Sequence, residues 1–315
     1  MKYVFGPVPS RRLGQSLGID PVPLKTCNWN CVYCQLGRTV PLINERKEFI
    51  PREEIFKEIK QTLVKHSLGE IDWVTFVGSG ETTLNSELGW MIKRTKEITD
   101  LPVAVITNGS LLYLPEVRNE LLFANAVLPT LDAGNPDLYR KINRPHPEIT
   151  YERLISGLTA FRKEYKDKLW VEVMLVQGLN DTRETLIEIA NALKDVNPDE
   201  IHINLPTRPP VEKWVRPPTE ESVNLAMGIF GELAHVVRPA DGYFDLGVGD
   251  DLEEAVIGII TRHPMRQEEL ERALEQWAPT EVQKTLDNLL ASGKALVVER
   301  NGVLFWSSGS THYPK

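Results

Sequence analysis

Cysteine is scarce in this sequence, which contains three cysteines among 315 residues. An odd number of clustered thiols excludes a small secreted scaffold held together by disulfides. The N-terminal segment MKYVFGPVPSRR shows no export signal, and no run approaches the roughly 18 apolar residues that a membrane-spanning helix needs. A net charge of −8 argues against a protein that binds polyanions over its whole surface. We therefore expect a cytoplasmic protein without a membrane partner, in which clustered thiols bind a metal or carry out redox chemistry.

All three thiols lie in the segment TCNWNCVYC, as Cys27, Cys31 and Cys34. A structural zinc site normally has four protein ligands and often uses CxxC pairs, but there is no second pair here and the six histidines are scattered. A [4Fe–4S] cluster fits the spacing better, because each thiolate binds a different iron corner. The fourth iron is then left without a protein ligand, which is what a catalytic cluster needs. The sequence therefore predicts an iron–sulfur cluster rather than zinc.

Short apolar runs alternate with longer amphipathic stretches through most of the chain. The apolar runs, each predicted to form a strand, are 16–20, 71–78, 101–108, 124–131, 169–176 and 200–206. The amphipathic stretches, each predicted to form a helix, are 86–98, 114–122, 150–165 and 181–196. Strands that alternate with helices form parallel sheets, so the pattern predicts an α/β fold, a partial (β/α)6 parallel barrel. The working loops of such a barrel lie at the C-terminal ends of its strands.

The alternation ends in the Pro-rich segment 207–219, which we expect to lack regular structure. A helix over 219–237 and a Gly/Asp-rich loop over 240–251 then close a first domain, residues 1–245. The second domain, residues 250–315, has a different pattern. Its predicted elements are helices at 251–264, 266–277 and 280–294 and a β-hairpin at 295–307 that turns at Asn301-Gly302. This order predicts a winged-helix domain.

The charge of the predicted winged helix bears on its partner. Residues 251–315 carry seven basic and ten acidic side chains, a net charge of −3. Contacts with phosphate supply most of the affinity for nucleic acids, and a negative surface repels them. We therefore expect this domain to contact a protein partner or to gate the substrate, rather than to bind a DNA duplex.

The CxxxCxxC motif in the first loop of a β/α barrel resembles the radical S-adenosylmethionine (radical SAM) superfamily. The stretch FGPVPSRRLGQSLGID, which leads into TCNWNCVYCQLG, is similar to its wyosine-synthase-related group. The resemblance implies that S-adenosylmethionine chelates the fourth iron and that an external donor of the flavodoxin or ferredoxin type reduces the cluster. Cleavage then releases a 5′-deoxyadenosyl radical that abstracts hydrogen. Archaeal-type wyosine synthases carry three further cysteines, which this chain lacks, so we do not expect wyosine chemistry itself.

The same resemblance assigns residues to S-adenosylmethionine. The segment VGSGETTL is similar to the Gly-Gly-Glu motif that binds the methionine amine, with Gly78, Gly80 and Glu81 in the matching positions and Ser79 between the glycines. The glycines would let backbone approach the ligand closely. Tyr33, just before the third cysteine, matches an aromatic residue near the adenine, and ordinary loop packing is the alternative.

The ends of later strands supply further candidates. Asn108 ends the third strand as a ligand contact or as a simple turn residue. In PTLDAG, the similarity to the molybdenum-cofactor branch makes Thr130 a hydroxyl that contacts S-adenosylmethionine, with Asp132 close by. Asp132 has an alternative role as the N-cap of the helix in NPDLYRKI. Leu205, after the sixth strand, is a candidate wall for the adenine or a core residue, and Asn180 is expected to shape a turn.

Basic residues gather on three predicted loops, two of which follow barrel strands. They are Arg11 and Arg12, then Lys141, Arg144 and His146, then Arg208, Lys213 and Arg216. Together they would suit a phosphate or carboxylate on the substrate, and salt bridges to the acidic excess are the alternative. An RNA, a peptide and a small-molecule substrate all remain open. A rival hypothesis from another class is a non-catalytic iron–sulfur redox sensor that signals through the winged helix.

Overall fold

An eight-stranded sheet, in the order β1 to β8, forms the frame of the molecule. The computed structural model describes residues 2–237, 244, 251–275, 277–300 and 302–311. The strands are β1 (Val4–Ser10), β2 (Gly14–Ile19), β3 (Trp73–Phe76), β4 (Val103–Thr107), β5 (Ala126–Pro129), β6 (Lys168–Met174), β7 (Glu200–Asn204) and β8 (Ala234–Val236). β1 and β2 form an antiparallel hairpin, and every pairing from β2 to β8 is parallel. The C-terminal ends of seven strands therefore share one edge of the sheet.

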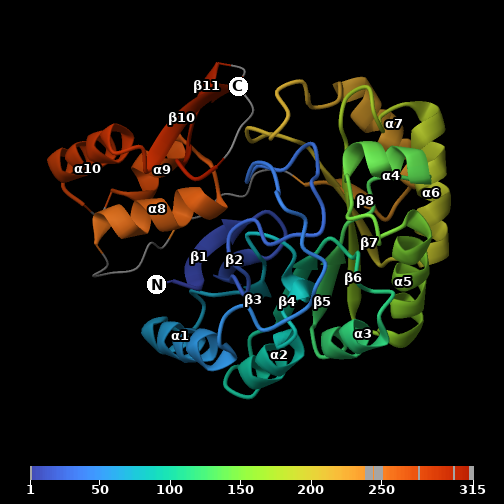
Figure 1. The fold of residues 1–315 in the computed structure, drawn as a ribbon, viewed down its shortest axis with the longest axis horizontal. Coiled ribbons are helices and arrows are strands. Elements are labelled where there is room, and N and C mark those ends of the chain that lie inside the picture. The colour runs from blue at the N-terminus through green and yellow to red at the C-terminus, as the bar shows by residue number, and fades with distance from the viewer. Residues whose placement is uncertain (1, 238–243, 245–250, 276, 301, 312–315) are drawn as a thin grey trace.

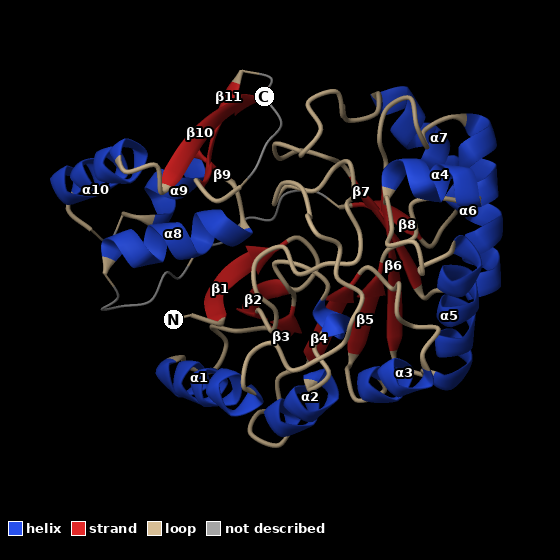
Figure 2. Cartoon of the chain, in the orientation of Figure 1, coloured by secondary structure: helices blue, strands red, loops and turns tan. Residues whose placement is uncertain are grey.

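Helices cover the outer face of this sheet, as Figures 1 and 2 show. They are α1 (Arg52–Lys65), α2 (Leu88–Lys96), α3 (Pro115–Leu121), α4 (Pro136–Ile142), α5 (Tyr151–Glu164), α6 (Arg183–Val196) and α7 (Glu220–Phe230), with a short 3-10 helix at Thr82–Leu84. Local sequence explains their ends: the Thr182 side chain accepts a hydrogen bond from Thr185 N at the start of α6, and Asn197 ends α6 in the left-handed conformation. This layered arrangement confirms a mixed α/β fold with a parallel sheet.

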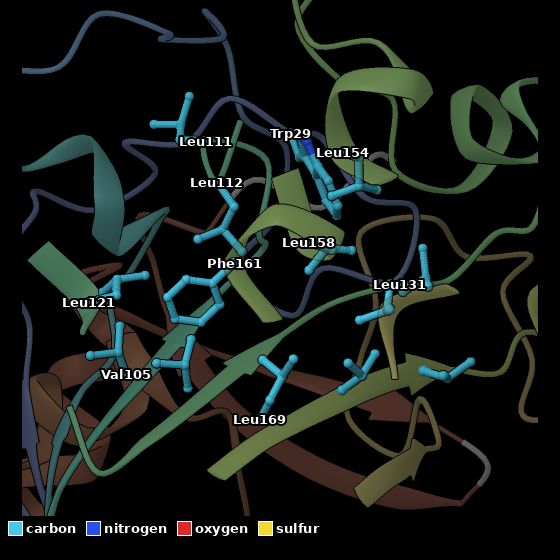
Figure 3. Packing of buried hydrophobic residues seen from close by; sticks show 14 of the residues in the cluster. Trp29, Val105, Leu111, Leu112, Leu121, Leu131, Leu154, Leu158, Phe161 and Leu169 are labelled. Carbon is cyan, nitrogen blue, oxygen red and sulfur yellow. The ribbon is translucent and has the colours of Figure 1, made fainter. Parts of the chain in front are cut away.

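The main hydrophobic core lies between the sheet and these helices (Figure 3). Alternate residues of each strand face opposite ways, as in β4, where Val103 and Val105 enter this core. Ala104 lies on the inner face, in a smaller cluster with Leu13 from the β1–β2 turn. Packing on the outer face of the sheet therefore stabilises the fold, whereas the inner face of the sheet does not contribute to this main core.

The six predicted strands correspond to β2 to β7, but three elements differ from the sequence prediction. The predicted helix over 219–237 is wrong in its second half, because α7 ends at Phe230 and residues 234–236 form β8. Gly231, with a φ of +78°, breaks the helix there. Helix α1 and strand β1 were not predicted. The Pro-rich segment 207–219 contains no helix or strand, as predicted.

The C-terminal segment contains α8 (Leu252–Arg262), β9 (Met265–Arg266), α9 (Gln267–Ala273), α10 (Pro279–Ala291), β10 (Ala295–Arg300) and β11 (Val303–Ser308). The three predicted helices and the predicted hairpin are present, and β9 adds a third strand in the order β10–β11–β9. Classification of this segment as a winged helix stays a prediction. The turn residue Asn301, most of the Gly/Asp-rich loop and the predicted domain boundary lie outside the described residues.

The C-terminal segment packs against the first strand of the sheet. Val8 of β1 belongs to the hydrophobic cluster that α8, α9 and α10 form, and Phe5 packs against the same cluster. Arg262, at the end of α8, forms an ion pair with Asp20, with 3.2 Å between Nε and Oδ2. Asp20 follows β2 directly, so this ion pair lies at the edge of the sheet where the C-terminal ends of the strands continue into the working loops. Within the described residues, no helix is long and apolar enough to cross a membrane.

Candidate active site

The cysteine loop follows β2 and gives each of its three half-buried thiols a nitrogen donor. These contacts are Trp29 N to Cys27 Sγ at 3.4 Å, Asn143 Nδ2 to Cys31 Sγ at 3.7 Å, and Lys25 Nζ to Cys34 Sγ at 3.4 Å. Asn108 Nδ2 adds a longer contact of 3.9 Å to Cys27 Sγ. Cys27 and Cys34 both act electrostatically on Cys31, and Cys34 acts on Cys27, so the three thiols lie within electrostatic range of one another.

The electrostatics of these thiols suit metal ligands. Burial raises the pKa of Cys27 to about 12, and it raises the pKa of Cys31 well above its ordinary value. A thiol in such a place ionises when a metal takes the place of its proton. Soft sulfur ligands surrounded by N–H donors and an ammonium group fit a [4Fe–4S] cluster, whose sulfurs accept hydrogen bonds from the protein. The three cysteines and the nitrogen donors around them therefore fit the predicted [4Fe–4S] cluster.

The loop after β3 lies directly on the cysteine loop. Lys25 N donates to Ser79 O at 2.7 Å, and Glu81 N donates to Thr26 O at 2.8 Å. A Cβ on Gly80 would overlap the Thr26 carbonyl oxygen and lie 2.5 Å from its carbonyl carbon. Gly80 is therefore required for a close approach between two protein loops, which is a different reason from the predicted approach of a ligand.

The other two members of this loop have related roles. A Cβ on Gly78 would lie 2.8 Å from Val22 Cγ2, so Gly78 also permits the loops to pack. Ser79, which interrupts the Gly-Gly-Glu pattern, donates from its N and Oγ atoms to the buried Asp20 at 2.9 and 2.5 Å. Since Asp20 also pairs with Arg262, this loop is connected to the C-terminal segment.

Glu81 is almost fully buried, and its carboxylate accepts hydrogen bonds from protein donors. Oε1 accepts from Thr83 N at 3.0 Å, from Thr83 Oγ1 at 2.5 Å and from Thr107 Oγ1 at 2.5 Å, and Oε2 accepts from Asn108 N at 2.6 Å. Burial raises the pKa of Glu81, and these hydrogen bonds oppose the rise. The structure thus places Glu81 as an anchor for the end of β4. Asn108, which it holds, is the residue that approaches Cys27.

Asp132 joins the end of β5 to the cysteine loop. Its Oδ2 accepts from Tyr33 OH at 2.6 Å and from Asn143 Nδ2 at 2.7 Å, and its Oδ1 accepts from Met174 N at 2.8 Å. Burial raises the pKa of Asp132 to about 6, against the effect of these hydrogen bonds. The alternative role of Asp132 as a helix N-cap is wrong, because Asn135 caps α4 by accepting from Leu138 N at 2.8 Å.

The remaining predicted residues lie at the same edge. Thr130 follows β5 and pairs with Glu172 of β6 through an isolated bridge. Its half-buried hydroxyl has no hydrogen-bond partner among the described residues, so a ligand can use it. Leu205 packs against the main core. Asn180 shapes the predicted turn, because its Oδ1 accepts from Val176 N at 2.7 Å and its Nδ2 donates to Asp132 O at 2.9 Å.

Sequence reasoning missed the amide side chains around the thiols. Asn28 is fully buried; its Oδ1 accepts from Asn108 Nδ2 at 2.8 Å, and its Nδ2 donates to Ser110 Oγ at 2.8 Å. Asn143 bridges Asp132 and Cys31. Asn28 stands next to Cys27 in the sequence, so its position could have identified it as a candidate site residue. Asn143 is more than 100 residues from Cys31, and no local pattern points to it.

The structure separates the predicted basic residues into two kinds. Arg12 pairs with Glu172, and Arg144 pairs with Glu212 at 2.5 Å, so the charges of both are neutralised. Arg11 Nη2 donates to Thr207 Oγ1 at 3.2 Å, and Arg208 Nη1 donates to Gln35 Oε1 at 3.2 Å. Neither of these two arginines forms an ion pair within the part of the chain that the structure describes. Burial, together with the charge of Arg11, lowers the pKa of Arg208 to about 10.

The other basic residues contribute less to the site. Lys141, Lys213 and Arg216 are exposed, and Arg216 Nη1 donates to Val215 O at 3.1 Å. His146 N donates to Asn28 O at 2.7 Å, so this residue supports the cysteine loop through its backbone. Of the predicted set, Arg11 and Arg208 are the two partly buried arginines without an ion pair in the described structure, and the negative charge of Glu269 acts on both.

Comparison with known proteins identifies the family. Residues 22–191, more than half of the chain, match the model of the Radical SAM superfamily. The chain is 36% identical to UPF0026 protein MJ1312 of Methanocaldococcus jannaschii, over 97% of this chain and 96% of that protein. It is 29% identical to a Methanococcus aeolicus protein named "Probable GTP 3′,8-cyclase", over 53% of this chain and 54% of the relative.

Solved structures show the same fold. A radical SAM methyltransferase from Sphaerobacter thermophilus superposes with a TM-score of 0.52 at 17% identity, over 70% of this chain and 66% of that one. The superfamily prediction is therefore confirmed, and S-adenosylmethionine and a [4Fe–4S] cluster are the cofactors of such a protein. The chain belongs to the radical SAM superfamily.

Proposed function

We propose that this protein is a radical SAM enzyme in which Cys27, Cys31 and Cys34 ligate the cluster, and the ends of β3, β4 and β5 bind S-adenosylmethionine. The observation that carries the proposal is the convergence of three partly buried thiols, each with its own nitrogen donor, on the loop that packs against residues 78–81. When bound, the reduced cluster supplies the electron that cleaves S-adenosylmethionine and yields the hydrogen-abstracting radical.

The residues around the thiols have distinct roles in this proposal. Lys25, Asn108 and Asn143 direct positive charge or N–H groups at the sulfurs, which favours the ionised ligands. Glu81 and Asp132 are positioning residues, because their carboxylates hold Asn108 and Asn143 and do not reach outward. Since these amides are fixed before any ligand arrives, the site requires little rearrangement on binding.

The hydroxyl of Thr130 and the ring of Tyr33 are the candidates for direct contact with S-adenosylmethionine. Thr130 is half-buried at the end of β5, with its hydroxyl unused among the described residues. The ring of Tyr33 is held in place because its hydroxyl donates to Asp132. Gly78 and Gly80 offer backbone groups on the same loop edge, although their small size already serves the packing of the two loops.

We assign to the substrate an anionic group, a phosphate or a carboxylate, held by Arg11 and Arg208. A partly buried guanidinium group that forms no ion pair is costly, and a bound anion lowers that cost. Arg208 lies in the loop after β7 that also contacts the cysteine loop, where Val211 N donates to Cys34 O at 2.9 Å. A nucleotide-like substrate agrees with the name of the relative, GTP 3′,8-cyclase.

Anaerobic reconstitution tests the cluster assignment. We expect about four irons per chain and an EPR signal of the reduced cluster that changes when S-adenosylmethionine is added, because one iron is open. Cys31→Ala should abolish both the iron loading and the change in the EPR signal. If Cys31→Ala binds as much iron as the parent chain, the ligand assignment is overturned. For the substrate, Arg208→Gln should raise KM for an anionic substrate and leave unstimulated cleavage of S-adenosylmethionine unchanged. An unchanged KM would overturn the role of Arg208.

A further inference from the structure

Two adjacent strands bring Glu200, His202 and His235 together on the inner face of the sheet. β7 and β8 are parallel, and His202 is the direct register partner of His235. Glu200 precedes His202 by two residues and so faces the same way. The neighbours Ile201 and Ala234 enter the main core on the opposite face. The three side chains therefore gather at β8, the last strand of the sheet.

The separations between their ligand atoms match a metal site. His202 Nε2 lies 3.0 Å from Glu200 Oε2, and His235 Nε2 lies 3.7 Å from the same oxygen. All three ligand atoms are within 4.8 Å of one another. A tetrahedral zinc ion with bonds of about 2.0–2.1 Å separates its ligand atoms by about 3.3 Å. The separations of 3.0 and 3.7 Å are both close to that value.

Burial and packing prepare the ligand set. His202 is 1% exposed, and the ring of Trp170 packs against it at 5.4 Å between centroids, which fixes its orientation. The side chains of Glu200 and His235 are 42% and 49% exposed, so an ion can enter and a water can complete its coordination.

The charges around the three residues do not oppose a cation strongly. Arg12 is the arginine whose charge acts on His202, and it is already paired with Glu172. His202 Nδ1 is buried without a hydrogen-bond partner among the described residues, whereas Nε2 faces Glu200, so Nε2 is the ring nitrogen that an ion can reach.

We propose that Glu200, His202 and His235 bind a divalent transition-metal ion, of which zinc best fits two imidazoles and one carboxylate. The ion ties β8, a strand of three residues, to β7 and leaves a fourth position open to water. The site lies on the two C-terminal strands of the sheet and contains none of the three cysteines. It is therefore independent of the proposed function.

The test uses protein that has been reconstituted with its iron–sulfur cluster, so that zinc does not compete for the cysteines. After dialysis against buffered Zn²⁺, we expect about one zinc per chain, and X-ray absorption at the zinc edge should show only nitrogen and oxygen ligands at about 2.0–2.1 Å. His235→Ala and Glu200→Gln, both at partly exposed side chains, should weaken zinc binding by more than about tenfold. The matched control His66→Ala, at the end of α1, should bind zinc like the parent chain.

Three outcomes would overturn the proposal. They are a zinc content near zero in the reconstituted protein, sulfur ligands at about 2.3 Å in the absorption spectrum, and equal zinc affinity in His235→Ala and the parent chain. Thermal unfolding gives a second readout, since zinc should raise the Tm of the parent chain and of His66→Ala but not of His235→Ala. Equal shifts in all three proteins would also contradict the site.

Discussion

The contact between Gly80 and the cysteine loop leads to a sharp prediction for Gly80→Ala. The added Cβ would lie 2.5 Å from the Thr26 carbonyl carbon, whereas ordinary contacts begin at 3.4 Å. The two loops would have to separate by at least 0.9 Å, the difference between these values. Both partners are backbone, so no flexible side chain can move aside. Gly80 does not have a positive φ, so the effect comes from crowding and not from backbone strain.

The expected cost follows from what that separation breaks. Two backbone hydrogen bonds hold the loops together, Lys25 N to Ser79 O and Glu81 N to Thr26 O. Each contributes about 1 kcal/mol, and overpacking of a rigid site costs about 1–3 kcal/mol more. We therefore expect Gly80→Ala to lower the free energy of unfolding by about 3–5 kcal/mol. The cluster should also load poorly, because Thr26 is the neighbour of Cys27.

Urea denaturation followed by circular dichroism measures the first effect, and iron content after anaerobic reconstitution measures the second. Gly228→Ala in α7 is the matched control, because a Cβ there meets nothing within 4 Å. It should load iron normally and gain up to about 1 kcal/mol from helix propensity. The reasoning is refuted if Gly80→Ala unfolds at the same urea concentration as the parent chain and binds the same amount of iron.

Two further predictions concern the junction with the C-terminal segment. Burial lowers the pKa of His263 to about 3, below its unfolded value of 6.5, so the folded state loses stability as pH falls through the interval between them. Between pH 7 and pH 5 this histidine should cost about 2 kcal/mol of unfolding free energy, and His263→Gln should flatten that part of the pH profile; an unchanged slope would contradict it. Arg262→Met leaves the buried Asp20 without its cation and should cost about 3 kcal/mol, measured by urea denaturation. Arg272→Met, at an exposed position of α9, is the control, and equal losses in both variants would count against the ion pair.

Much of the fold could be predicted because local sequence and packing agree in the strands. In β4 the run VAVIT places Val103 and Val105 on the core side, as a buried parallel strand requires. β8 could not be predicted in the same way, because its residues Ala234–Val236 continue a helical pattern. The break depends on Gly231 and on pairing with β7, which joins residues more than 30 positions apart.

The candidate site was predictable where its residues are neighbours in sequence. The cysteines and the Gly-Ser-Gly-Glu segment were visible as motifs, but the roles of individual residues were not. Glu81 and Asp132 have protein partners that come from other strands, so their function as positioning residues depends on tertiary structure. The same holds for Arg208, whose lack of an ion pair within the described residues cannot be seen in a loop sequence.

The most direct test of the account is the formation of 5′-deoxyadenosine when the reconstituted protein is reduced with dithionite in the presence of S-adenosylmethionine. We predict that the parent chain forms 5′-deoxyadenosine and that Cys31→Ala does not. Asn143→Ala should form less, because it removes the donor to Cys31 and leaves Asp132 with one partner fewer. Full cluster loading without 5′-deoxyadenosine, and without a change in the EPR signal on adding S-adenosylmethionine, would contradict the enzyme assignment and favour a redox sensor.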